Sequence, residues 1–412
     1  MTGQTDKAGG SGPAKVSAGG LGAALPVALL AGLALGAAAA SCARGPAALA
    51  AGDLRCGNRE RLLGADTGRP AFSWRLVSTA RAEVQTACRV QVARSAADFG
   101  SGSGLVWDSG KIMEAQNPSL IYGGAELNPG TEYSWRVRVW DGRGRPGTWS
   151  AASSFVTGLT RPGDWSGARW IAHETLPDRL KLVPGVHGAG DDLGEAARRR
   201  PVVPLFRREF SARGDIEKAI IFVCGLGHYE LTVNGRRVSD SFLAPGWTAY
   251  DKTCLYNVHD VTGLVVEGPN ALGLVVGNGF FNVNRERYRK LVIAYGMPAA
   301  ILKLKVDYRS GESDVVVSGP DWKTAPSPVT YSSIYGGEDY DARLEQSGWD
   351  RPGFEDASWR AAIAVDGPGG RLEPEVDHPL RVAEEFAPAR ITRPRPGVSV
   401  YDFGQNASGI TS

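Results

Sequence analysis

Residues 131–141, TEYSWRVRVWD, decide the fold class of this chain. Large apolar side chains from Tyr133 to Val139 alternate with polar or charged ones, among them Arg136. A period of two residues is typical of a strand with one buried face. The preceding Pro129-Gly130 pair supplies a turn signal, so this stretch predicts a half-buried β-strand.

The same pattern continues on both sides of this stretch. Residues 88–92 alternate in the same way, and so do residues 301–308, ILKLKVDY, and residues 228–238, HYELTVNGRRV. The Asn-Gly pair inside the last segment is a strong hairpin signal. No long segment after residue 41 has the apolar period of a helix, and residues 354–362, FEDASWRAA, are interpreted as a short connector. The chain is therefore predicted to be all-β.

Composition limits the class of protein. The chain has 412 residues, of which 42% are hydrophobic and 22% are charged, as in ordinary globular proteins. The formal net charge is only +2, so nucleic acid is not an expected partner. The 54 glycines fit a chain with many turns.

The N-terminus has the organisation of an export signal. Two lysines precede an uncharged apolar run at residues 21–40, and small residues follow before Cys42. This layout predicts a signal peptide over residues 1–41, and a retained membrane anchor is the alternative. Residues 39–42, AASC, resemble a lipoprotein cleavage box, which makes Cys42 a lipidation candidate. The predicted location is periplasmic, extracellular or lipid-anchored, with membrane contact only through the signal or the lipid.

Four cysteines follow the predicted signal peptide. Pairing of Cys56 with Cys88 and of Cys224 with Cys254 would keep each disulfide within one domain. Buried free thiols are the alternative, and the sequence leaves both open. No CxxC pair or histidine cluster indicates a zinc site.

The turn signals divide the chain into three parts. Residues 53–160 predict a small β-sandwich, and residues 164–335 predict a second one with an inserted loop at 174–204. Residues 336–412 are predicted to be a linker and an incomplete β-domain. If this last part folds stably, we expect it to pack onto the second sandwich.

Carboxylates form the first set of candidate binding residues. Glu338 and Asp341 lie in residues 336–345, GGEDYDARLE. Carboxylates bind sugars because they accept hydrogen bonds from adjacent hydroxyl groups. A structural ion pair between an aspartate and Arg343 is the alternative. Neighbouring positions do not establish the geometry of a catalytic carboxylate pair, so no catalytic residue is assigned.

Aromatic and amide side chains form the second set. An aromatic ring can cover the apolar face of a sugar while amides bind its hydroxyl groups. Loop packing is the alternative for each residue. Asn and Asp oxygens in such loops could also bind Ca²⁺, but no spacing here identifies a metal site. The sugar-binding candidates of this set are Trp247, Tyr250, Asn278, Phe280, Phe281 and Asn282.

Many ordered segments resemble the N-terminal region of bacterial alpha-L-rhamnosidases. RPAFSWRL, QTACRVQVARS, VWDSGKI and YSWRVRVWD resemble the leading fibronectin type III-like sandwich of these enzymes. DWSGARWIA, LFRREF, GLGHYELTVNGRRV, LAPGWTAYDKTCLYNVHDVTGLV and NALGLVVGNGFF resemble their jelly-roll domain. GGEDYDARLEQSGWDRPGFEDASW and VYDFGQNASG resemble the passage into a third β-domain. The resemblance runs from about residue 70 to the last residue.

This resemblance implies a function but no catalytic residue. The family releases terminal alpha-L-rhamnose by inverting hydrolysis, on a six-hairpin barrel that follows the region resembled here. The chain is accordingly expected to be a non-catalytic, carbohydrate-positioning region that stops before that barrel, so whether it is itself an enzyme is left open. Its expected partners are rhamnose-containing glycosides or polysaccharides. Phe280 and Phe281 replace a Trp-Tyr pair common in the family, which removes two polar contacts. A rhamnose-binding surface module and a structural β-scaffold are the alternatives.

Overall fold

The computed structural model describes residues 49–113, 119–182, 194, 199–288, 291–406 and 409. The predicted signal peptide at 1–41, the lipidation candidate Cys42 and much of the predicted insertion at 174–204 lie outside the described residues. Within the described ranges, no helix has the length and apolarity needed to cross a membrane. The described fold is nearly all β, as the sequence predicts.

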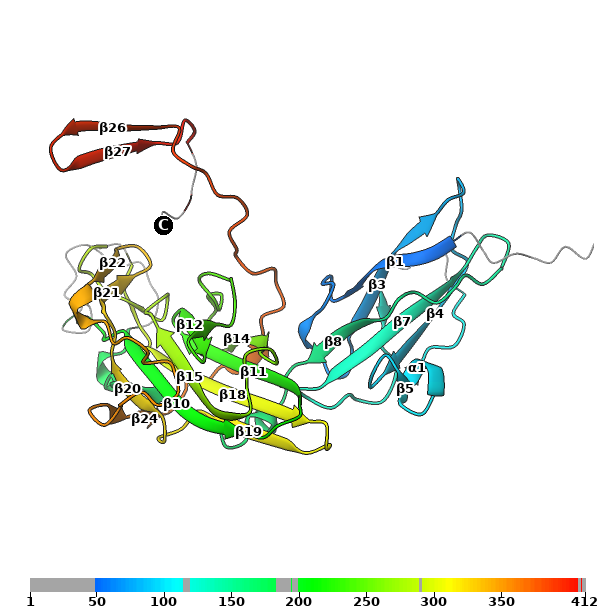
Figure 1. The fold of residues 1–412 in the computed structure, drawn as a ribbon, viewed down its shortest axis with the longest axis horizontal. Helices are drawn as coiled ribbons and strands as arrows, with labels where there is room; N and C mark the ends of the chain where they lie inside the picture. The colour runs from blue at the N-terminus through cyan, green and yellow to red at the C-terminus, as the bar shows by residue number, and fades with distance from the viewer. Residues whose placement is uncertain are drawn as a thin grey trace, which may run out of the picture. The chain divides into compact units, whose positions relative to one another are not determined.

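The first domain is a sandwich of two sheets, drawn in blue to cyan in Figure 1. One sheet has the order β1-β3-β6, and the other has the order β2-β8-β7-β4-β5. The first sheet consists of β1 (Leu49–Cys56), β3 (Ala71–Ser78) and β6 (Leu120–Ile121). The second consists of β2 (Leu63–Ala65), β8 (Ser153–Thr157), β7 (Glu132–Trp140), β4 (Ala87–Ala93) and β5 (Leu105–Asp108), and the short helix α1 (Asp98–Ser101) precedes β5.

The stretch that decides the fold class becomes β7, and its apolar face builds the core of this sandwich. Its side chains alternate strictly between buried and half-buried. The Trp135 ring packs against Phe72 of the opposite sheet, with ring centroids 4.6 Å apart. Contacts of this kind bury large apolar areas and hold the two sheets together.

The second domain is a larger sandwich, drawn in green to orange in Figure 1. Its two sheets have the orders β13-β12-β15-β10-β20-β23 and β24-β9-β18-β11-β14-β25, and β19 (Ser313–Val317) pairs with β18. The first sheet consists of β13 (Arg236–Arg237), β12 (Tyr229–Val233), β15 (Gly268–Val276), β10 (Pro204–Ala212), β20 (Lys323–Pro326) and β23 (Arg360–Ala361). The second consists of β24 (Ile363–Val365), β9 (Trp170–Ala172), β18 (Ala299–Tyr308), β11 (Ile216–Leu226), β14 (Thr253–Asp260) and β25 (Arg371–Pro374).

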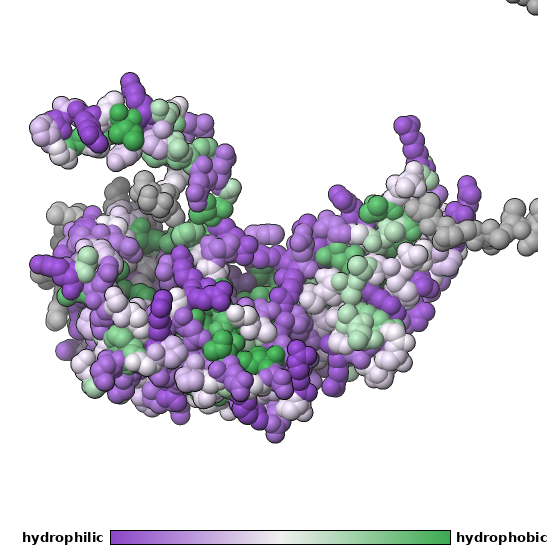
Figure 2. Space-filling view, in the orientation of Figure 1, coloured by the Kyte–Doolittle hydropathy of each residue, from purple (hydrophilic) through white to green (hydrophobic). Residues whose placement is uncertain are grey.

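The core of the second sandwich follows from alternation in β18. Leu302, Leu304 and Val306 of this strand are buried against the facing sheet, while Lys303 and Lys305 lie on its other side. Charged and polar residues cover most of the surface seen in Figure 2, and its hydrophobic residues form separate patches. The apolar face of β18 is therefore directed inward.

Short elements connect the larger ones. Three two-stranded ladders are formed by β16 (Asn282–Val283) with β17 (Ile293–Ala294), β21 (Val329–Ser333) with β22 (Gly337–Tyr340), and β26 (Arg390–Arg395) with β27 (Val398–Asp402). Single 3₁₀ turns occur at η1 (Pro162–Trp165), η2 (Asp178–Leu180) and η4 (Ala342–Leu344). Residues 354–362 contain no helix, as their interpretation as a connector requires.

The part of the chain after residue 336 divides differently from the sequence prediction. Strands β23, β24 and β25 complete the two sheets of the second sandwich, where β25 runs parallel to β14. Trp359, just before β23, is buried. Burial of this large apolar side chain explains why the segment joins the sandwich. Of the described strands, β26 and β27 pair only with each other. The second sandwich thus extends beyond the predicted boundary at residue 335.

The four cysteines described are all buried, and none of them forms a disulfide. Of the two alternatives that the sequence leaves open, the structure therefore has buried thiols rather than disulfides. Burial raises the pKa of Cys56 and of Cys254 to about 12, which keeps both thiols protonated at neutral pH.

Candidate functional site

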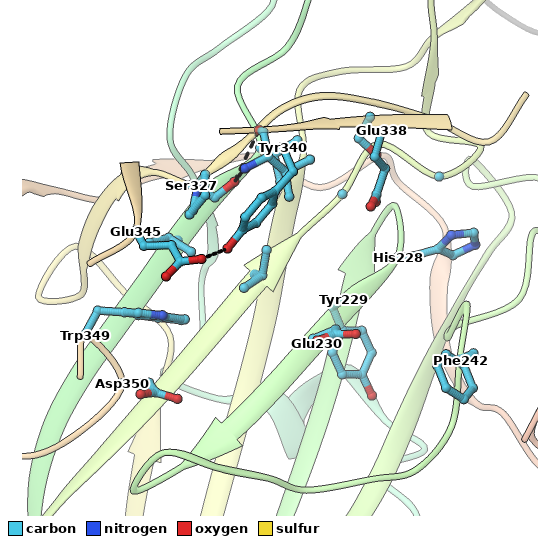
Figure 3. Close-up of a pocket in the computed structure, with 18 of the residues that line it drawn as sticks. His228, Tyr229, Glu230, Phe242, Ser327, Glu338, Tyr340, Glu345, Trp349 and Asp350 are labelled. Carbon is cyan, nitrogen blue, oxygen red and sulfur yellow. Dashed lines mark hydrogen bonds between the residues drawn. The ribbon is translucent and has the colours of Figure 1, made fainter. Parts of the chain in front are cut away.

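A cleft of about 960 Å³ lies beside the six-stranded sheet of the second sandwich. One wall comes from β12 and the turn before it, and the other comes from β21, β22 and residues 345–350. Figure 3 shows His228, Tyr229 and Glu230 on the first wall, opposite Glu338, Tyr340 and Glu345. A cleft of this size can hold a small ligand.

The charged groups of the cleft all have the same sign. Glu230, Glu338, Glu345 and Asp350 line it, and its described lining contains neither Lys nor Arg. The Tyr340 hydroxyl donates a hydrogen bond to Glu345 over 2.5 Å, and this bond raises the pKa of the Tyr340 phenol. Glu230 is paired with Arg237 at 3.1 Å, so the negative charge of the cleft rests mainly on Glu338, Glu345 and Asp350. Carboxylates can accept hydrogen bonds from neutral ligands and repel anionic ones.

Aromatic rings stand between these carboxylates, as Figure 3 shows for Tyr340 and Trp349. On the opposite wall, the Tyr229 hydroxyl donates to Asn257 over 3.0 Å and lies 2.8 Å from Nε2 of His259. Burial raises the pKa of Tyr229 well above its ordinary value. The Tyr229 ring is therefore held in one orientation by polar partners behind the wall.

A buried arginine holds the loop that carries Trp349. Arg207 of β10 is only 2% exposed, and its Nε donates to the Trp349 carbonyl over 2.8 Å. The same guanidinium donates to the Arg351 carbonyl over 3.1 Å and forms ion pairs with Glu209 and Asp356. A buried guanidinium needs such partners, so the sheet and the cleft wall are joined by an interaction that is costly to break.

Four exposed or half-exposed rings contact one another, and we call them the aromatic ridge: Trp247, Phe280, Tyr288 and Tyr335. Trp247 stacks on Phe280 with centroids 4.3 Å apart and planes 7° apart, and Tyr335 stacks on Tyr288 at 4.2 Å. Phe280 meets Tyr335 edge to face at 5.9 Å. Trp247 and Tyr335 are 48% and 47% exposed. Exposed stacked rings can cover the apolar face of a ligand.

His228 links the ridge to the cleft. It lines the cleft and meets Phe280 edge to face, with ring centroids 6.5 Å apart. Burial lowers the pKa of His228, which favours the neutral imidazole. The ridge and the cleft are thus neighbouring parts of one surface.

The structure places the two predicted carboxylates differently. Glu338 lines the cleft. Asp341 caps η4 instead: it accepts from the Arg343 backbone N–H over 3.1 Å and pairs with the Arg343 guanidinium at 2.5 Å. The structural ion pair that the sequence offers as an alternative is therefore present, and it engages Asp341.

The predicted aromatic and amide residues also separate into two groups. Trp247 and Phe280 belong to the aromatic ridge, whereas Tyr250 and Phe281 are each 4% exposed and pack edge to face on each other. Asn278 donates to the Ser332 carbonyl over 2.6 Å and Asn282 to the Gly296 carbonyl over 2.9 Å. Both amides are buried and tie loops together. In this conformation, of these predicted residues, only Trp247 and Phe280 are accessible to a ligand.

Sequence reasoning does not identify several residues of the surface. Tyr335 lies in the turn between β21 and β22, and Trp349 and Asp350 lie in the loop after η4. Trp349, Asp350 and Glu230 lie in segments that resemble the rhamnosidase family, whereas Tyr335 lies just outside them. Glu230 is an outward residue of an ordinary alternating strand, so its sequence position gives no sign of a cleft.

Within the described ranges, no three His, Cys, Asp or Glu side chains gather as metal ligands. The amide oxygens of Asn278 and Asn282 are buried without a hydrogen-bond partner, but they belong to different contacts. These residues give no geometric basis for the calcium site that the sequence left open.

Two family models match the two sandwiches. Residues 51–161 match the "Rha78A-like, N-terminal immunoglobulin domain", and residues 214–384 match the "Alpha-L-rhamnosidase N-terminal domain". The chain contains the N-terminal domains of the alpha-L-rhamnosidase family. The second match ends beyond β25, in agreement with the strands that this segment adds to the second sandwich. Immunoglobulin and fibronectin type III domains share the two-sheet sandwich of the first domain.

Curated alpha-L-rhamnosidases match most of the chain. The enzyme of Formosa agariphila is 29% identical over 350 residues, which cover 82% of this chain and 36% of the relative. The enzyme of Streptomyces avermitilis is also 29% identical, over 85% of this chain and 48% of the relative. The chain thus spans less than half the length of these rhamnosidases.

Solved rhamnosidase structures have the same fold over this region. The alpha-L-rhamnosidase of Dictyoglumus thermophilum is 36% identical with a TM-score of 0.73, over 86% of this chain and 38% of its own. The Streptomyces avermitilis enzyme, solved in complex with L-rhamnose, is 26% identical with a TM-score of 0.74, over 87% and 49%. The rhamnosidase domains described here therefore have close structural counterparts in longer proteins.

Proposed function

We propose that the chain is the carbohydrate-positioning N-terminal part of an exported alpha-L-rhamnosidase, and that its cleft binds rhamnose-containing glycosides. The observation that carries this proposal is the lining of the cleft, which combines four carboxylates with aromatic rings and has no described Lys or Arg. Rhamnose is an uncharged polyhydroxyl ligand with an apolar ring face. Carboxylates accept its hydroxyl hydrogens, and the rings cover its C–H groups.

The comparisons support the choice of sugar. The relatives that match most of this chain are alpha-L-rhamnosidases, and one of their structures contains L-rhamnose. In the proposed whole enzyme, hydrolysis inverts the anomeric centre, which requires one carboxylic acid and one carboxylate that activates water. We assign neither role to a residue of this chain, whose part is to bind and orient the glycan. The predicted signal peptide at residues 1–41 supports export.

Titration of the full chain with L-rhamnose and with aryl and oligosaccharide rhamnosides tests the proposal, with affinity measured by calorimetry. Glu338→Gln keeps the shape of the side chain and removes its charge. Because a hydrogen bond to a charged group contributes about 1.5–3 kcal/mol, we expect this variant to weaken binding by about tenfold or more.

Glu217→Gln is the matched control, because Glu217 is an exposed glutamate of β11 that does not line the cleft. It should bind rhamnosides as the unaltered chain does. A rhamnose-binding surface module would also show saturable binding by the chain alone. If the chain shows no saturable binding to any rhamnoside, the proposal is refuted and a structural scaffold remains. Equal affinities of the two variants would exclude Glu338 from the binding site.

A further inference from the structure

The outer face of the five-stranded sheet of the first sandwich carries a group of arginines. Residues of β7 alternate between core and surface, so Arg136 and Arg138 lie on this outer face. Arg89 of β4 lies directly opposite Arg138, and Gln91 lies opposite Arg136. Three guanidinium groups from two adjacent strands therefore share one surface.

Aromatic rings alternate with these guanidinium groups. The central carbon of Arg136 lies 4.5 Å from the centre of the Phe99 ring and 4.3 Å from that of the Trp149 ring. Arg138 lies 4.7 Å and Arg89 lies 5.9 Å from the same Trp149 ring. We call these five residues the arginine ladder. Stacking on rings orients a guanidinium while its N–H groups stay available at the edge.

Lys111 extends the positive surface of the ladder along β7. Its ammonium group lies 5.0 Å from the centre of the Trp140 ring, and Trp140 follows Arg138 on the same face of the strand. Residues two apart in a strand are separated by about 6.6 Å. The cations thus form a row along the strand rather than a single point charge.

The charges of the ladder are not balanced. Asp108 binds Arg89 through two hydrogen bonds, of 2.8 and 2.5 Å. Arg136 donates only to neutral oxygens, those of Gln91 and the Phe99 carbonyl. The Arg138 Nε is buried without a hydrogen-bond partner. One carboxylate therefore faces three guanidinium groups within the described part of this surface.

This imbalance of charge lowers the stability of the chain when no ligand is bound. Like charges directly opposite each other in adjacent strands are destabilising, and Arg89 and Arg138 have this arrangement. Burial, together with the charges of Arg138 and Arg89, lowers the pKa of Arg136. An anion at this face would relieve the repulsion between the guanidinium groups.

We propose that the arginine ladder binds the acidic groups of a polyanionic polysaccharide, through carboxylates or sulfates held by Arg136 and Arg138. Guanidinium groups bind such planar or tetrahedral oxyanions through paired hydrogen bonds. The row of cations along β7 suits a linear polymer with repeated charges, and the ring edges between them suit the C–H faces of its sugars. An acidic protein lacks this regular repeat.

The ladder and the cleft would then select different parts of a glycan. The described lining of the cleft has four carboxylates, of which Glu230 is paired with Arg237, and neither Lys nor Arg. The cleft therefore disfavours acidic sugars, whereas the ladder attracts them. Binding at the ladder does not depend on the proposed function of the cleft. Loss of either activity can therefore be observed without loss of the other.

Affinity electrophoresis of the full chain tests the ladder, in gels that contain polygalacturonate, dextran sulfate or neutral dextran. We expect retardation by at least one of the two polyanions, no retardation by dextran, and weaker binding at higher salt because ions screen exposed charges. Retardation by polygalacturonate alone would identify carboxylates as the preferred group, and retardation by dextran sulfate would identify sulfates.

Arg138→Gln is the decisive variant, since it removes a guanidinium that makes no hydrogen bond described here. It should weaken polyanion binding by about tenfold, which corresponds to about 1.4 kcal/mol. Arg75→Gln is the matched control, because Arg75 is an exposed arginine of β3 in the other sheet of the same sandwich. Asp108→Asn should strengthen binding, since among the described residues Asp108 is the carboxylate that faces the ladder.

Thermal unfolding of each variant shows whether the sandwich stays folded, and binding is compared only among folded variants. Equal retardation of the Arg138→Gln and Arg75→Gln variants would overturn the proposal. Equal retardation of the unaltered chain by dextran and by the polyanions would also overturn it. Binding of an acidic protein in the absence of any polyanion binding would assign the surface to a protein partner instead.

Discussion

His173 shows how a single buried residue makes this fold sensitive to acid. Its Nδ1 lies 3.1 Å from the Thr324 hydroxyl, which itself donates to the Leu205 carbonyl, so the imidazole donates to Thr324. Burial and the nearby charge of Arg360 lower the pKa of His173 from 6.5 to about 4. The folded chain therefore holds a neutral imidazole at pH values where the unfolded chain is protonated.

We expect the free energy of unfolding to fall as the pH decreases from about 6.5 towards 4. The unfolded state binds the extra proton in this range, and the loss through His173 amounts to roughly 3 kcal/mol. Urea unfolding at pH 7 and pH 4 measures it, for the unaltered chain and for His173→Asn. The variant should lose less stability between the two pH values, and an equal loss would contradict the assignment.

At the scale of elements, the turn between β11 and β12 sets the position of one wall of the cleft. Gly227 occupies this turn with φ of +110°, and a Cβ there would lie 1.8 Å from the Gly277 carbonyl oxygen. No side chain fits at that distance from backbone, and the conformation itself favours glycine. Gly227→Ala should therefore shift the turn and lower the free energy of unfolding by about 3 kcal/mol or more.

Gly311→Ala is the matched control for this turn. Gly311 also has a positive φ, of +86°, but a Cβ added there meets no atom within 4 Å. Only the backbone preference opposes this substitution, at a cost of about 1–2 kcal/mol. Denaturant unfolding of both variants compares these costs, and equal values would show that the close approach to Gly277 does not matter.

At the scale of the whole molecule, Tyr256 of the second sandwich binds the chain segment that leaves the first sandwich. Its hydroxyl accepts from the Leu159 backbone N–H over 2.6 Å and donates to the Leu159 carbonyl over 3.2 Å. Tyr256 and Leu159 are both buried. Tyr256→Phe leaves two buried peptide groups without partners, so we expect a loss of about 1–3 kcal/mol.

The expected loss is measured by thermal unfolding, together with the rate of proteolysis between residues 158 and 161. Tyr401→Phe makes the same chemical change at an exposed tyrosine of β27 and should change neither quantity. A Tyr256→Phe variant as stable and as resistant as the unaltered chain would show that these hydrogen bonds do not secure the connection.

The predictability of the fold depends on the length of each strand. β7 and β18 are long and alternate regularly, so their buried faces follow from the residues alone. β23, β24 and β25 have between two and four residues and pair with strands distant in the sequence. Such short segments have no period to detect, which explains why the boundary of the second sandwich was predicted too early.

The sequence by itself determined the all-β class, the two sandwiches and the resemblance to rhamnosidases, because alternation and motifs are local properties of the chain. Only the tertiary structure decided which polar residues act together. It gathers Glu230 with Glu338 at one cleft and directs Asp341 to Arg343. It also turns the charged face of β7, visible in the sequence as alternating arginines, into a ladder with Trp149. These groupings depend on long-range strand pairing and turn geometry, which no single stretch of sequence contains.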